Sequence, residues 1–163
     1  MAFITWISDA VFKIEKVAAI LLTSTMLVSL SAGVFYRYVL SSPLTWSDEV
    51  AIFSLVWLTF IGGSMGIKQQ SSAAVTIFMD RFKGTLRTIL MGISLLAVLI
   101  FVIYILYLSF VWLSSPNILL QRSSSMRLPM IIPYLSIPVS FTFLAVHSLD
   151  LLLKNFSGKK EAI

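Results

Sequence analysis

Long apolar runs alternate with short charged segments along this sequence. Residues 17–36 pass 20 positions without a charged side chain, and residues 50–67 pass 18. A helix of about 20 residues rises about 30 Å, which is the thickness of the hydrocarbon core of a bilayer. The pattern predicts an all-α integral membrane protein with four transmembrane helices, at residues 17–37, 50–68, 88–113 and 130–150.

The third and fourth runs differ from simple straight spans. A helix over residues 88–113 would be about 40 Å long, so we expect it to tilt or to project beyond the membrane. The fourth run contains Pro129, Pro133 and Pro138. The first two suit an irregular entry to the helix, whereas Pro138 lies deeper and predicts a kink because proline has no N–H to donate.

The segments between the spans include two that are too apolar for free linkers, residues 1–16 and 69–87. In the first, apolar side chains recur at helical spacing, and in the second they are interleaved with charged ones. We predict an amphipathic helix in the membrane interface at each. The alternative is that both segments continue the neighbouring spans as helix. The other segments are loops at residues 38–49 and 114–129 and a tail at 151–163.

Lysine and arginine are distributed unevenly among these segments. Nine of the twelve lie in the N-terminal segment, the second connection and the tail, and only Arg37, Arg122 and Arg127 lie near the other two loops. Positive residues are retained on the cytoplasmic side of a membrane. We therefore expect both termini in the cytoplasm and the loops at 38–49 and 114–129 on the outer face.

Composition narrows the possible chemistry. The mean hydropathy is +0.97, 58% of the residues are hydrophobic and there is no cysteine. The net charge of +5 indicates contact with anionic lipid headgroups and no nucleic-acid partner. None of the four uncharged runs contains an acidic or basic residue, although such residues mark ion pathways and substrate sites in membranes.

The single histidine, His147, is a candidate proton switch or metal ligand. Without cysteine or clustered carboxylates, we interpret it as an interfacial or hydrogen-bonded structural residue. A haem held by two histidines of this chain is excluded. The sequence therefore predicts no catalytic, substrate-binding or metal-binding residue and no cofactor, so we do not expect an enzyme.

Small residues supply the helix-packing candidates, because they let helix backbones approach closely in lipid. They form one stripe in the first span and a GxxxG motif in the second: Thr25, Ser29 and Gly33, and Gly62 and Gly66. We favour packing within this bundle over contact with another subunit.

The two outer loops concentrate charge. Arg37 ends the first span, and Trp46, Ser47, Asp48 and Glu49 lead into the second. Each has a local interpretation, in which Ser47 caps the helix, the acids favour its N-terminal end and Trp46 lies at the interface. Alternatively, Arg37, Asp48 and Glu49 form an ion-pair cluster that fixes the loop, while Arg122 and Arg127 contact a partner.

At these residues the sequence resembles the small membrane subunit, the DctQ-like or Q component, of tripartite ATP-independent periplasmic (TRAP) transporters. The resemblance covers nearly the whole chain and rests on the order and spacing of short motifs: Arg37-Tyr38, Pro43, Trp46, Asp48-Glu49, the glycine-rich end of the second span before Lys68, Arg127-Leu128-Pro129, Tyr134 and Ile137-Pro138.

The resemblance implies a scaffold subunit of the bacterial inner membrane. Such a subunit packs against the static part of a large M subunit, which holds the substrate and sodium sites. A periplasmic binding protein delivers a carboxylate substrate, such as sialic acid or a C4-dicarboxylate. Membrane lipids are the remaining partners.

Two other classes compete with this interpretation. A stand-alone transporter or channel would need several copies of the chain to build a polar path from Ser, Thr and His147. A membrane enzyme or haem anchor lacks the necessary side chains. An adjacent gene for a large membrane protein and another for a secreted binding protein would favour the TRAP interpretation.

Overall fold

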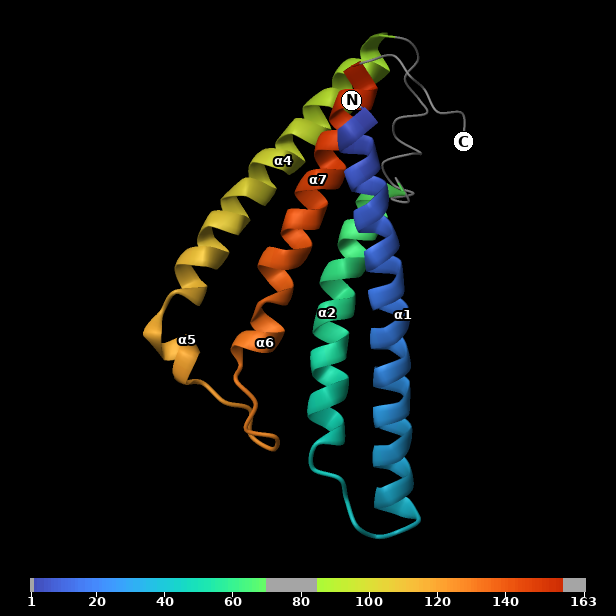
Figure 1. Ribbon diagram of the computed structural model, residues 1–163, viewed down its shortest axis with the longest axis vertical. Coiled ribbons are helices and arrows are strands. Elements are labelled where there is room, and N and C mark those ends of the chain that lie inside the picture. The colour runs from blue at the N-terminus through green and yellow to red at the C-terminus, as the bar shows by residue number, and fades with distance from the viewer. Residues whose placement is uncertain (1, 70–84, 157–163) are drawn as a thin grey trace.

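The computed structural model describes residues 2–69 and 85–156, which form helices and connecting loops without a β-strand (Figure 1). The helices are α1 (Ala2–Tyr38), α2 (Ser47–Lys68), α4 (Thr85–Leu113), α5 (Pro116–Leu120), α6 (Ile131–Tyr134) and α7 (Ser136–Phe156). Four helical segments are long and apolar enough to cross a membrane, and α6 and α7 together make the last of them. The predicted all-α class with four spans is confirmed. The predicted interfacial helix at 69–87 falls mainly outside the described residues.

Helix α1 is continuous over 37 residues, or about 55 Å. The predicted interfacial segment at 1–16 and the span at 17–37 therefore form one continuous helix, as the helical-continuation alternative has it, and the depth of residues 1–16 in the membrane stays a prediction. No proline interrupts α1, and the only glycine in it is Gly33. Its N-terminal polar side chains also find partners on other helices of the bundle, as described below.

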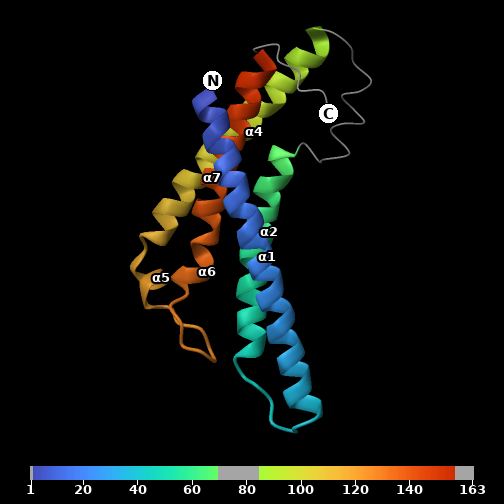
Figure 2. The same cartoon turned by 45° about the vertical axis from the view of Figure 1, so that its right-hand side comes forward.

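The helices pack in the spatial order α1, α2, α7, α4, with α7 also touching α1. Figures 1 and 2 both show α1 and α2 side by side down to the loop that joins them, while α4 diverges from α2 toward its lower end. Phe60 of α2 meets Phe141 of α7 with ring centroids 6.2 Å apart. Near the top of α4, a Cβ on Gly92 would lie 3.0 Å from the ring of Phe156. Large apolar side chains remain exposed along α1 and α4.

The fourth span is interrupted at Leu135, between α6 and α7. Pro138 lies in the first turn of α7, and its missing N–H leaves the carbonyl of Tyr134 without the usual helical donor. The kink predicted from Pro138 fits this break. The Trp57 indole of α2 donates to the Ile132 carbonyl at 3.2 Å, which holds the short α6 against the bundle.

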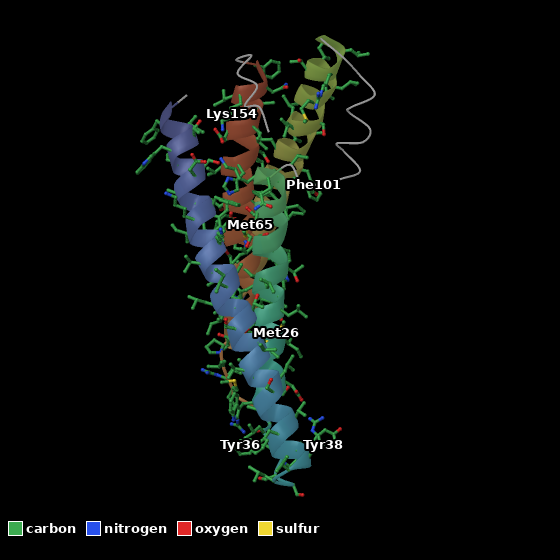
Figure 3. All side chains as sticks on the ribbon, turned by 90° about the vertical axis from the view of Figure 1, so that its right-hand side faces the viewer. Met26, Tyr36, Tyr38, Met65, Phe101 and Lys154 are labelled. Carbon is green, nitrogen blue, oxygen red and sulfur yellow. The ribbon has the colours of Figure 1, made fainter. Side chains whose placement is uncertain are left out.

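The two ends of the bundle differ in character. We call one end the loop face, because it carries the connections 39–46 and 121–130. We call the other end the Lys68 end, where α1 and α4 begin and α2 and α7 finish. Figure 3 places Lys154 at the Lys68 end and Tyr36 and Tyr38 near the loop face.

Candidate functional site

At the loop face, the side chains singled out from the sequence form two separate contacts. Arg37 pairs with Asp48 at 3.5 Å, and both side chains are more than half exposed. Glu49 does not join this pair. The expected three-residue cluster is therefore reduced to one loose ion pair, which is worth at most about 1 kcal/mol as an exposed bridge.

Glu49 instead holds the other loop. Its Oε1 accepts the backbone N–H of Ser125 at 2.7 Å, and its Oε2 accepts that of Met126 at 3.0 Å. Hydrogen bonds to an ionised acceptor are stronger than those between neutral groups. One carboxylate thus fastens the tip of residues 121–130 to the first turn of α2.

Residues 121–130 fold back on themselves as a short hairpin. The backbone N–H of Met130 donates to the Gln121 carbonyl at 3.0 Å, and the backbone N–H of Ser123 donates to the Leu128 carbonyl at 2.8 Å. Arg127 has a φ of 53°, an uncommon conformation for a residue with a side chain. Its carbonyl accepts a bond from Arg122 Nη1 at 3.3 Å, and both arginine side chains are exposed.

The first turn of α2 is not capped as expected. The residue before the helix is Trp46, which is 41% exposed and makes no capping bond. Ser47 turns inward, is buried and donates to the Leu44 carbonyl at 3.1 Å. The Ser47 cap expected from the sequence is therefore wrong, because the close approach of α1 leaves the hydroxyl in the helix contact.

Of the small-residue candidates, Ser29 and Gly33 lie in the contact between α1 and α2. Ser29 donates to the Ser47 carbonyl at 2.6 Å, and a Cβ on Gly33 would lie 2.6 Å from Ser47 Oγ. Thr25 is exposed. A Cβ on Gly62 would meet nothing within 4 Å, so this glycine does not mediate packing within the chain, and Gly66 is half-buried.

At the Lys68 end, charged and polar side chains from three helices form a cluster. Lys68 Nζ lies 2.9 Å from both Asp9 Oδ1 and Asp150 Oδ2, and it donates to Ser8 Oγ at 2.7 Å. Asp150 Oδ1 accepts a bond from Thr5 at 2.8 Å, and Lys154 lies 3.5 Å from Asp150 Oδ2. These contacts join the start of α1 to the ends of α2 and α7.

His147 extends this cluster into the bundle. Its Nδ1 lies 2.8 Å from Ser8 Oγ, and its Nε2 lies 2.9 Å from Glu15 Oε2. His147 and Glu15 are both fully buried. The structure thus makes His147 hydrogen-bonded and internal. Within the described residues, no group of three or more His, Asp or Glu side chains is arranged to hold a metal ion.

Comparison with known proteins identifies the family. Residues 26–158 match the family described as "Tripartite ATP-independent periplasmic transporters, DctQ component". This chain belongs to the DctQ family. The resemblance seen in the motifs is therefore confirmed, and the family is a transporter component, which is not an enzyme class. Four apolar helices and this membership together indicate a multi-pass protein of the inner membrane.

Three relatives show how the DctQ family varies. The chain is 29% identical over 119 residues to the isethionate TRAP transporter permease protein DctMQ of Oleidesulfovibrio alaskensis, covering 73% of this chain and 18% of that relative. It is 22% identical to the C4-dicarboxylate small permease protein DctQ of Vibrio cholerae, covering 90% of this chain and 73% of the relative. It is 28% identical over 69 residues to the sialic acid small permease protein SiaQ of the same species, covering 42% and 40%.

Sequence reasoning missed the cluster at the Lys68 end of this DctQ-family chain. Ser8 and Glu15 are seven residues apart, so two helical turns place both on one face of α1. The same spacing separates Asp9 and Lys16. His147 and Asp150 are three apart on α7 and also share a face. These two spacings were the signal in the sequence that polar side chains gather on one face of α1 and one face of α7. The partners on different helices lie 59 residues (Asp9 and Lys68) to 145 residues (Thr5 and Asp150) apart in sequence, so the pairing itself needed the structure.

Proposed function

We propose that this chain is the small scaffold subunit of a TRAP transporter and packs against the static part of a large M subunit. The observation that carries the proposal is the confinement of charge to the ends of the bundle. Among the described residues, Lys68 and Asp150 lie at one end and Glu49 at the other. Glu15 is buried deeper, where it pairs with His147, and no acidic or basic side chain is buried between this pair and Glu49. A substrate anion or a sodium ion needs compensating groups at depth.

The exposed apolar surface supports the partner part of the proposal. Helices α1 and α4 lie at the two edges of the packing order, and most of their large apolar side chains are exposed. Lipid can cover such surfaces, and so can the helices of a larger subunit. The relative named DctMQ carries both component names in one protein, of which this chain matches 18%.

The transport reaction proposed is sodium-driven uptake of a carboxylate substrate delivered by a periplasmic binding protein. Sodium and substrate would bind the M subunit, and this chain would need no cofactor. The names of relatives include sialic acid and C4-dicarboxylates, both of which carry carboxylates, and isethionate, another organic anion. We propose that both termini lie in the cytoplasm and that the loop face meets the binding protein.

Co-purification tests the assembly. A tagged full-length chain, extracted from its native membrane with mild detergent, should bring down a large multi-span protein in a fixed ratio. The purified complex with its binding protein should transport in proteoliposomes only with a sodium gradient. The chain alone should neither transport nor bind sodium. Transport by this chain without a partner would reject the scaffold role and favour a stand-alone homo-oligomer.

A further inference from the structure

The scaffold role makes no use of the buried pair formed by His147 and Glu15. Both side chains have no solvent exposure, and Nε2 of the ring lies 2.9 Å from Oε2 of the carboxyl group. Glu15 Oε1 has no hydrogen-bond partner among the described residues. The rings of Phe12 and His147 form a T-shaped pair with their centroids 6.5 Å apart. An ionised carboxylate in such surroundings loses its hydration and gains one bond in return.

The neighbouring charges do not compensate this carboxylate. The charged groups of the adjoining cluster, which Ser8 links to the pair, are Asp9 of α1, Lys68 of α2, and Asp150 and Lys154 of α7. Two lysines and two aspartates cancel, and Lys68 is already shared between the two aspartates and Ser8. The adjoining cluster therefore offers the pair no net positive charge.

One additional proton makes the pair neutral, and it has two possible positions. If the proton is on His147, an imidazolium donates from Nε2 to the Glu15 carboxylate. If it is on Glu15, the carboxylic acid donates from Oε2 to Nε2 of a neutral ring. In both cases His147 Nδ1 carries a hydrogen and donates to Ser8 Oγ, 2.8 Å away.

We propose that His147 and Glu15 form an internal proton-binding site, with one proton held between Nε2 and Oε2, and that the bound proton fastens α1 to α7. When this proton leaves, a negative charge stays on the pair, Nδ1 becomes an acceptor and the Ser8 hydroxyl turns to donate to it. Lys68 can keep donating to Ser8 Oγ throughout. The site goes beyond the scaffold role and does not depend on it.

The chain is well suited to a direct test, because His147 is its only histidine. The full-length protein in detergent micelles would be labelled with ¹⁵N in the imidazole and ¹³C in the glutamate carboxyl groups. NMR at pH 7 then reports the protonation of both partners. Glu15→Gln, nearly the same size, assigns the Glu15 carboxyl signal by removing it. Asp48→Asn is the control, because Asp48 is an exposed acid at the opposite end of the bundle and takes no part in the charge balance at the Lys68 end.

Two spectra support the proposal: a doubly protonated ring beside an ionised Glu15, or a ring protonated at Nδ1 beside a neutral Glu15. Asp48→Asn should leave that spectrum unchanged. Glu15→Leu, which leaves Nε2 without its partner, should lower the unfolding temperature of the chain. An ionised Glu15 beside a ring with one protonated nitrogen would overturn the proposal, since the pair would then hold no additional proton. A Glu15→Leu protein as stable as the parent would overturn the fastening of α1 by that proton.

Discussion

At the residue scale, Gly33 shows how closely α1 and α2 approach. A Cβ at this position would lie 2.6 Å from Ser47 Oγ and 3.1 Å from Ser47 Cβ. We expect Gly33→Ala to push the helices apart and to destabilise the chain by about 1 to 3 kcal/mol, the usual cost of overpacking. The midpoint of thermal unfolding in detergent measures this effect.

Gly62→Ala is the matched control for that change. No atom lies within 4 Å of its would-be Cβ, and alanine is favoured over glycine in a helix by up to about 1 kcal/mol. We expect this variant to be as stable as the parent chain or slightly more so. If Gly33→Ala behaves in the same way, the helix contact is not as close as described.

Glu49 supplies a second residue-scale prediction. Each of its oxygens accepts one backbone N–H of the hairpin tip, and the amide of Glu49→Gln has only one oxygen for the two donors. We expect hydrogen exchange at Ser125 and Met126 to accelerate by about tenfold or more, because bonds to charged acceptors are the stronger ones. Asp48→Asn should leave both amides protected. Unchanged exchange in Glu49→Gln would mean that the hairpin is held by its own internal bonds.

At the scale of elements, hydropathy predicted the four spans but did not show that the first 16 residues continue the first span as one helix. A run of about 20 apolar residues specifies a membrane helix by length alone, so α2, α4 and the α6–α7 segment could be predicted. Where Thr5, Ser8 and Asp9 go depends on Lys68 and Asp150, which no local pattern links to them. The amphipathic pattern was therefore assigned to the membrane interface, although its polar side meets other helices.

Local sequence patterns also failed to reveal which residues pair at the loop face. The charged residues there were identified correctly as a group, but their partners were not. Arg37 pairs with Asp48, as the sequence separation of eleven residues allows. Glu49 binds backbone amides 76 and 77 residues away, and a backbone donor leaves no mark in the sequence.

The next prediction concerns how firmly the first half of α1 is held by Lys68 of α2. Lys68→Met keeps the apolar stem but leaves the Asp150 side chain, which is 2% exposed, without its closest cation. Breaking such a buried pair costs about 3 kcal/mol or more. We expect faster hydrogen exchange in residues 4–16 of α1 and unchanged exchange in residues 20–36. Lys13→Met, at an exposed lysine of the same helix, should change neither. Equal protection in Lys68→Met would show that packing alone holds this half of α1.

At the scale of the whole molecule, the two ends of the bundle differ in how their charged side chains are engaged. The clustered charges at the Lys68 end largely cancel one another. At the loop face Glu49 is engaged by backbone donors and Asp48 by Arg37, while Arg122 and Arg127 remain exposed. The loop face therefore presents positive charge to any protein that approaches it.

The last prediction follows from the exposure of these two arginines. Exposed arginines contribute little to stability, but they steer an acidic partner and accelerate its association. On the proposed topology, we expect reversal of Arg122 and Arg127 to glutamate to slow binding of the periplasmic binding protein by about tenfold at low salt. Near 1 M salt the Debye length falls to about 3 Å, so the difference should vanish. Arg37→Gln, which removes a paired charge on the same face, is the control. Association rates measured by surface plasmon resonance on the intact complex decide the matter, and equal low-salt rates for the reversed and parent chains would remove these arginines from the docking surface.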